Sequence, residues 1–351
     1  KSYLEEAVGT WRNSFDWRKH EAKLNEAGSF KYKTDSGLEL HYLHKKSGSR
    51  NAIPLLLTHG WPGSVQEFLK VIPLLIKGKE GIEFDVVCPA IPGYGFSDKP
   101  KELGMNAKEV AKLENELMLA LGYTKYIAQG GDWGSMVSKW IAELFPENCI
   151  GLHLNLVIAF PPDGADPMDG VLPEEIEGMK NLEKYQATGY GYFAIQSTKP
   201  QTLGYGLNDS PVGLAAWIIE KFHGWANKES GQLVVPLDEV LAIVSLYWYT
   251  ESITSSARFY YENGPMGFSL NKISQPMAGA IFKNEIARPP KVWADEIYNI
   301  IQWNQHPGGH FAALENPEIL AEDIFSYAPK NLFGGFKFGH SRIALHHFSI
   351  T

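Results

Sequence analysis

Cysteine is scarce in this chain, with only Cys88 and Cys149 among 351 residues. Both stand in short apolar runs, so we expect two buried small hydrophobic side chains and no disulfide framework. No group of Cys and His residues has the spacing of zinc ligands, which argues against a metal site. No stretch approaches the roughly 20 apolar residues that cross a bilayer, and no signal-peptide core opens the chain.

Positive charge is also in short supply, because 32 Lys and Arg face 40 Asp and Glu and leave a net charge of -8. Such a surface attracts neither nucleic acid nor an anionic membrane, so neither is expected as a partner. We expect a soluble, cytoplasmic protein for the chain as given. The chain starts at Lys1 and not at Met, which leaves open a membrane anchor before it. A homodimer is compatible with the sequence.

The order of apolar runs predicts the fold class. Short continuous runs alternate with helical stretches from Ile53, stop near Phe160 and resume at Pro276. Such runs are typical of parallel strands that helices cover on both faces. The segment in between is rich in Pro, Gly and aromatic residues, is helical where it is periodic and has no convincing strand. We therefore predict an α/β-hydrolase fold, with a mostly parallel central sheet flanked by helices and a mainly helical lid insert.

The expected division of the chain has four parts. Residues 1–45 form an N-terminal helical and hairpin extension that wraps the core, 46–160 the first part of the core, 161–265 the helical lid, and 266–351 the second part of the core. Within these parts the apolar patterns predict particular elements. The expected strands are 53–57, 84–88, 126–128, 150–154, 276–282 and 297–303, with a hairpin over 30–44. The expected helices are 107–121, 133–145, 212–225, 237–261 and 317–327.

Asp132 is the strongest candidate for chemistry. It stands in Gly130-Gly-Asp-Trp-Gly134, between an apolar run and an amphipathic helix. Taken alone, an Asp in such a turn is ordinarily a helix N-cap. The strand, sharp turn and helix together are typical of a nucleophile elbow, in which small residues flank a strained nucleophile. A carboxylate there would form an ester with the carbon that it attacks, which indicates displacement at a saturated electrophilic carbon.

A base and an acid follow in the chain order that this fold requires. His310, in Gly308-Gly-His-Phe311, comes after the last expected strand and before the last helix, where a base can reach the elbow. His306 is the weaker alternative. The orienting acid is expected at the end of the preceding strand, where Glu285 is the first carboxylate.

A loop after the first core strand, Thr58-His-Gly-Trp-Pro-Gly63, can point a backbone N–H into the same site. We expect the N–H groups of Trp61 and Trp133 to form an oxyanion hole. His59 is interpreted as a residue that organises this loop and not as a base.

Together these motifs resemble the epoxide hydrolases of the α/β-hydrolase superfamily, in the branch that contains the microsomal enzymes. The resemblance extends over nearly the whole chain and includes Asn208-Asp-Ser-Pro-Val-Gly-Leu214. It implies that two lid tyrosines hydrogen-bond the epoxide oxygen, and by position these are Tyr192 and Tyr260. Tyr190 and Tyr261 are their neighbours. The membrane-spanning N-terminal segment of the microsomal relatives has no counterpart here.

The resemblance implies an epoxide hydrolase that makes vicinal diols from a hydrophobic epoxide and water, without cofactor or metal. Asp132 would be the nucleophile, His310 the base and Glu285 the orienting acid. Aromatic side chains would form an apolar pocket, and the expected ones are Trp133, Phe193, Phe160 and Trp248. Two alternatives remain: a haloalkane dehalogenase, which uses the same kind of nucleophile without paired tyrosines, and a hydrolase-fold protein that binds a ligand without catalysis.

Overall fold

The computed structural model describes residues 1–264, 267, 269–328 and 348–350. Two of the expected parts therefore extend past the described residues. The end of the predicted lid, residue 265, lies outside them, and so do 266, 268, 329–347 and 351 of the predicted second core part.

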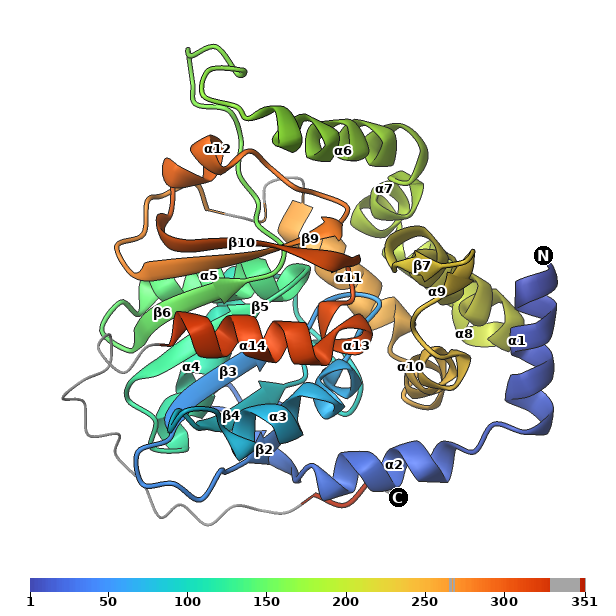
Figure 1. Cartoon of the computed structure of the whole chain (residues 1–351). Helices are drawn as coiled ribbons and strands as arrows, with labels where there is room; N and C mark the ends of the chain where they lie inside the picture. The colour runs from blue at the N-terminus through green and yellow to red at the C-terminus, as the bar shows by residue number, and fades with distance from the viewer. Residues whose placement is uncertain (265–266, 268, 329–347, 351) are drawn as a thin grey trace.

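A sheet of eight strands forms the centre of the molecule (Figure 1). β1 and β2 pair in antiparallel fashion, β2 is antiparallel to β4, and every other pairing in the sheet is parallel. The α/β-hydrolase fold, the edge hairpin and each of the expected core strands are thus confirmed. In sheet order the strands are β1 (Ser29–Lys33), β2 (Glu39–Lys45), β4 (Phe84–Pro89), β3 (Ile53–Thr58), β5 (Tyr126–Gly130), β6 (Cys149–Leu154), β9 (Pro276–Asn284) and β10 (Asn299–Gly309).

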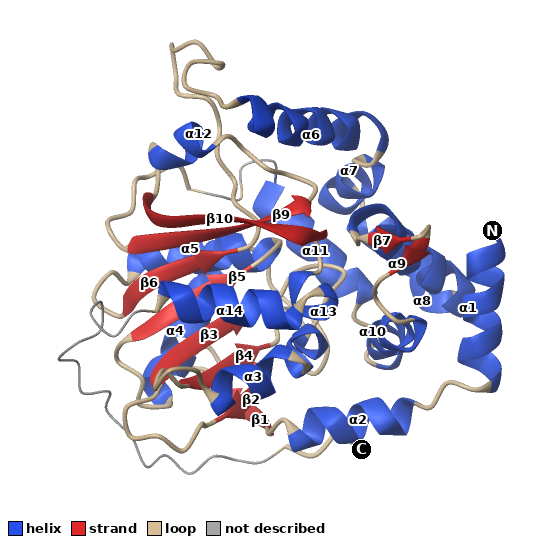
Figure 2. Ribbon diagram, viewed as in Figure 1, coloured by secondary structure: helices blue, strands red, loops and turns tan. Residues whose placement is uncertain are grey.

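Helices cover both faces of the sheet, which explains the continuous apolar runs (Figure 2). Leu55 and Leu57 pack into the cluster under α3 and α14, whereas Leu56 packs into the cluster with α4 and α5. Successive side chains of a strand point to opposite faces, so a strand buried on both faces must be apolar throughout. The helices concerned are α3 (Val71–Lys77), α4 (Ala107–Ala120), α5 (Trp133–Leu144) and α14 (Pro317–Tyr327).

The other elements outside the lid are short or belong to the N-terminal segment. Cys88 and Cys149 are buried and free, as predicted. In the part of the chain that the structure describes, no helix is long and apolar enough to cross a membrane. Outside the predicted lid, the remaining elements are α1 (Ser2–Asn13), α2 (Trp17–Glu26), the 3-10 helix η1 (Val65–Leu69), α12 (Lys291–Asp295) and α13 (Ala312–Glu315). A second 3-10 helix, η2 (Pro173–Glu175), lies within the predicted lid.

Six helices, α6 to α11, which we call the lid helices, lie beside the sheet, and of these α8 and α9 are next to α1 (Figure 1). The prediction of one helix over 237–261 is wrong, because α10 ends at Tyr249 and α11 begins at Ile253. The expectation of no strand in this region is also wrong, since a small hairpin, β7 with β8, turns at Ser230 and Gly231. Each of these two strands has only two residues, which is too short to show the alternation of apolar and polar residues that predicts a strand. The elements are α6 (Ile176–Thr188), α7 (Gly191–Thr198), α8 (Pro200–Asp209), α9 (Pro211–Trp225), β7 (Lys228–Glu229), β8 (Gln232–Leu233), α10 (Leu237–Tyr249) and α11 (Ile253–Asn263).

The carboxyl ends of the parallel strands bring distant residues together. His59 follows β3, Asp132 comes two residues after β5, Glu285 follows β9 and His310 follows β10. In an open parallel sheet this edge is where polar side chains converge and ligands bind.

Candidate active site

Asp132 sits on a strained turn between β5 and α5. Its backbone has φ 50° and ψ -131°, a conformation that L-residues seldom adopt. The flanking glycines allow it, because a Cβ on Gly134 would collide with the carbonyl of Thr58, and one on Gly130 with the backbone of Gly134. The sharp turn therefore presents the Asp132 side chain at the edge of the sheet.

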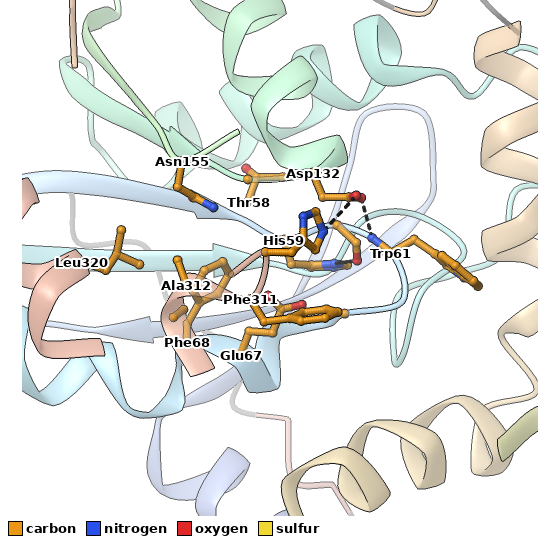
Figure 3. A pocket seen from close by; sticks show the side chains of 15 residues that line it. Thr58, His59, Trp61, Glu67, Phe68, Asp132, Asn155, Phe311, Ala312 and Leu320 are labelled. Atoms are coloured by element: carbon orange, nitrogen blue, oxygen red, sulfur yellow. Dashed lines mark hydrogen bonds and ion pairs between the residues drawn. The ribbon is translucent and has the colours of Figure 1, made fainter. Parts of the chain in front are cut away.

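Both oxygens of the Asp132 carboxylate are engaged. The Trp61 N–H donates to Oδ1 at 2.8 Å, and His310 Nε2 lies 3.3 Å from Oδ2 (Figure 3). Trp133 begins α5, yet no described hydrogen bond joins its N–H to this carboxylate. The Trp61 half of the predicted oxyanion hole thus faces the carboxylate, and the part of Trp133 stays a prediction.

His310 is held on its other side by Glu285. Its Nδ1 lies 2.6 Å from Glu285 Oε1, which also accepts the N–H of Ile286 at 2.7 Å. The two side chains are only 3 % and 2 % exposed. The structure therefore brings Asp132, His310 and Glu285 together, with His310 between the two carboxylates, and their catalytic roles stay a prediction. His306, the weaker alternative, contacts Asp323 elsewhere.

The neighbouring charges govern the protonation of His310. Burial alone would lower its pKa, but the carboxylates of Glu285 and Asp132 outweigh burial and hold the pKa well above its ordinary value. Because one of these two charges belongs to Asp132, the basicity of His310 depends on whether Asp132 is a free carboxylate.

His59 organises the loop that carries Trp61. Its Nδ1 lies 2.9 Å from the carbonyl oxygen of Gly60, and the N–H of Ile91 donates to its Nε2 at 3.2 Å. Burial lowers the pKa of His59 to about 4. A neutral ring with both nitrogens engaged agrees with the interpretation of His59 as a structural residue.

Glu315 holds the His310 loop and was missed by the sequence analysis. Its carboxylate accepts the N–H groups of Gly309 and Phe311 at 2.9 Å each, and that of Asn227 at 2.8 Å. These bonds bring backbone donors from both sides of His310, and one from the lid side, onto a single carboxylate. Only the presence of an acid just before the last expected helix could have suggested it.

Glu67 on η1 is a second residue that the sequence did not indicate. Its Oε1 accepts the N–H of Ser64 at 3.1 Å, just beyond the Trp61 loop. Burial raises the pKa of Glu67 to about 8; the charge of Asp132 acts in the same direction, whereas that of His310 opposes it. A cavity of about 20 Å³ is lined by Glu67, Asp132, Asn155 and His310 (Figure 3), and this is room for one water molecule.

The two predicted lid tyrosines lie close together in an aromatic cluster. Their ring centroids are 5.8 Å apart, and Tyr192 and Tyr260 are 5 % and 1 % exposed. Tyr192 stacks on the ring of Trp61 at 5.2 Å, and Tyr260 meets the ring of Trp133 edge-on at 4.8 Å. Trp61 donates its backbone N–H to Asp132, and Trp133 is the next residue in the chain after Asp132. Both tyrosines therefore lie close to the proposed nucleophile.

The aromatic residues expected to line an apolar pocket have different surroundings, and their role as a lining stays a prediction. Phe193 on α7 stacks on Trp133 and meets Tyr260 edge-on, with centroid distances of 6.4 and 5.1 Å. Trp248 is partly buried and packs against the large apolar core that contains Trp133. Phe160 is 47 % exposed, so its expected place in a closed apolar pocket is not supported. Within the described residues, no three His, Cys, Asp or Glu side chains gather as metal ligands would.

Comparison with known proteins shows the family of this chain. Residues 1–68 match the family described as "Epoxide hydrolase N terminus", and residues 53–182 match "alpha/beta hydrolase fold". The chain is 41 % identical over 358 residues to "Epoxide hydrolase 1" of Sus scrofa, an alignment that covers 92 % of this chain and 79 % of that protein. The chain belongs to the epoxide hydrolase family.

Solved structures place this epoxide hydrolase among enzymes with the same fold. The structure of Aspergillus niger epoxide hydrolase is similar with a TM-score of 0.85 and 34 % identity, over 93 % of this chain and 84 % of that one. The juvenile hormone epoxide hydrolase of the silkworm Bombyx mori has a TM-score of 0.86 and 33 % identity, with the same coverage. The prediction of an epoxide hydrolase is therefore confirmed.

Proposed function

We propose that this epoxide hydrolase converts hydrophobic epoxides to vicinal diols through a covalent ester on Asp132. The observation that carries the proposal is the position of His310 between the carboxylates of Asp132 and Glu285. Tyr192 and Tyr260 lie together in the aromatic cluster beside Asp132. A carboxylate with a general base behind it and neutral donors beside it suits a displacement followed by hydrolysis. The aromatic rings around the carboxylate favour an apolar substrate.

In the first step, an oxygen of Asp132 attacks a ring carbon and the carbon–oxygen bond of the epoxide breaks. The electron pair goes to the epoxide oxygen, which becomes an alkoxide. Burial raises the pKa of both Tyr192 and Tyr260 well above its ordinary value, so both are neutral phenols that can donate hydrogen bonds. One of them then protonates the alkoxide. The product is an ester of Asp132 that carries a free hydroxyl group.

In the second step, water attacks the carboxyl carbon of Asp132. The ester has no charge, so one of the two carboxylates that raise the pKa of His310 is gone. The pKa falls, so Nε2 releases its proton to solvent and can then accept one from water while Nδ1–H remains donated to Glu285. The cavity beside Glu67 and His310 offers space for this water molecule. The N–H groups of Trp61 and Trp133 would receive the oxyanion. Its collapse breaks the ester bond, the departing oxygen takes the remaining hydroxyl proton of the intermediate, and the diol leaves as the Asp132 carboxylate is restored.

A comparison of two substrate types tests the proposal. Purified protein should release diol from styrene oxide and no halide from a 1-chloroalkane of similar size. Asp132→Ala should release neither diol nor halide. Halide release without diol would favour the dehalogenase alternative. Binding of styrene oxide by the folded wild-type protein without either product would favour the binding protein. Diol from Asp132→Ala would exclude Asp132 as the nucleophile.

A further inference from the structure

A third lid tyrosine contacts Tyr192. The hydroxyl oxygens of Tyr185 on α6 and Tyr192 on α7 are 2.8 Å apart and share a hydrogen bond. The two residues are seven positions apart in sequence, and the chain turns at Gly189 between the helices. Trp61 stacks on the Tyr192 ring. A buried phenol that must give up a proton therefore has a second phenol as its hydrogen-bond partner.

Tyr185 also reaches toward solvent. It lines a cleft of about 610 Å³ between α6, the end of α9 and the chain that follows β9. Lys184 and Thr188, which line the same cleft, are exposed. Tyr192 does not line this cleft and is 5 % exposed. Tyr185 thus stands between the buried hydroxyl of Tyr192 and water.

A buried ammonium group lies on the ring of Tyr192. Lys221 on α9 is 4 % exposed, and its Nζ is 4.3 Å from the centroid of the Tyr192 ring. Glu220 pairs with this ammonium group. A cation near a phenol favours the phenolate form, so Lys221 would stabilise Tyr192 while it lacks its proton.

We propose that Tyr185 returns the proton that Tyr192 gives to the substrate. This inference rests on the proposed function, in which Tyr192 protonates the alkoxide. Tyr192 then becomes a phenolate, Tyr185 passes its hydroxyl proton to that phenolate, and Tyr185 takes a proton from water in the cleft. The net change is one proton from solvent for each alkoxide protonated. Tyr185 is a relay residue and does not touch the substrate.

The test is Tyr185→Phe, which keeps the ring and removes the relay hydroxyl. Stopped-flow ultraviolet absorbance with styrene oxide should detect tyrosinate that appears with alkylation and then decays. In Tyr185→Phe the first alkylation should change by less than about tenfold, because only one hydrogen bond to Tyr192 is lost. The decay of tyrosinate should slow by at least about tenfold, because a positioned proton donor is missing.

Tyr190→Phe is the matched control, since its ring lies 6.0 Å from that of Tyr185 and is 36 % exposed. It should behave as the wild type does. Wild-type decay of tyrosinate in Tyr185→Phe, or no tyrosinate in the wild type, would overturn the relay. Loss of alkylation as large as in Tyr192→Phe would also overturn it, because Tyr185 would then act by orienting Tyr192. Normal alkylation in Tyr192→Phe would instead refute the proposed role of Tyr192 itself.

Discussion

Two hydroxyl groups on different lid helices, Tyr192 on α7 and Tyr260 on α11, are expected to share one developing negative charge. Tyr192→Phe and Tyr260→Phe should each slow alkylation by roughly 100- to 1000-fold, the range for loss of one donor to an oxyanion. The double variant should be nearly inactive. Rapid-quench measurement of the first turnover separates this rate from ester hydrolysis.

Tyr261→Phe is the control for this pair, because Tyr261 is the chain neighbour of Tyr260 and is 50 % exposed. It should leave the alkylation rate unchanged. If Tyr260→Phe behaved as this control does, Tyr260 would be a packing residue. In the same way, Tyr192 would be a packing residue if Tyr192→Phe behaved as Tyr190→Phe does.

Single residues were predictable where a motif fixed their place at a strand end. Asp132, Glu285 and His310 follow strands whose carboxyl ends share one edge of the sheet, so the chain order alone brought them together. Glu67, Glu315 and Tyr185 gave no such signal. Their contacts depend on how η1, the His310 loop and α6 pack in three dimensions, and no local pattern encodes that packing.

At the scale of elements, a buried carboxylate joins α14 to two strands. Asp323 accepts hydrogen bonds at 2.5 to 2.9 Å from the side chains of His153 on β6 and of Gln302, Asn304 and His306 on β10. Burial alone would raise the pKa of Asp323, but the hydrogen bond with His153 and those from β10 hold it well below its ordinary value. The ionised form is therefore the one that ties these elements together.

Asp323→Asn should lower the free energy of unfolding at pH 7 by about 1–3 kcal/mol, because it leaves buried donors unpaired. A carboxylate with a lowered pKa stabilises the fold above its unfolded value of about 4, and this stabilisation is lost as the pH falls below it. The wild type should thus lose stability below about pH 4 more steeply than the variant does. Chemical denaturation between pH 7 and pH 2.5 measures both effects.

Glu322→Gln, on the exposed side of α14, should cost less than about 1 kcal/mol. Parallel curves for the wild type and Asp323→Asn would refute this account of Asp323.

Elements were predictable where burial dictates composition, and less so where a backbone turn does. β3, β5 and α14 matched their apolar patterns because both faces of the sheet are covered. The break between α10 and α11 was missed. It occurs at Glu251, which adopts φ 49°, and the N–H of Ser252 donates back to the carbonyl of Tyr247 at 3.1 Å. This is a helix end of the kind that glycine usually marks, and here no glycine is present.

At the scale of the molecule, the N-terminal segment fastens the lid. Figure 1 shows α1 beside α8 and α9, away from the sheet. The indole N–H of Trp11 donates to Ser245 Oγ on α10 at 2.7 Å, and His20 on α2 lies 2.9 Å from Asp238, also on α10. The sequence predicted a helical N-terminal extension against the core, without saying which helices it contacts. Its specific attachment to the lid helices could not be read from the sequence.

Trp11→Phe should destabilise the lid by about 1–3 kcal/mol, because it leaves the buried hydroxyl of Ser245 unpaired. Hydrogen exchange should accelerate in α9 and α10 and remain unchanged in β3 and β5. Arg12→Ala, an exposed change on the same helix, is the control and should alter neither. Equal acceleration throughout the sheet would mean that the segment stabilises the whole fold and not the lid.

The ester on Asp132 is the central claim, and His310→Gln tests it most directly. Without the base, attack by Asp132 remains possible while hydrolysis is blocked, so the ester should accumulate. Intact-protein mass spectrometry after addition of styrene oxide should show one adduct of the mass of the epoxide, and proteolysis should map it to the peptide that contains Asp132. Diol formation by His310→Gln without any adduct, or an adduct on another residue, would contradict the two-step mechanism.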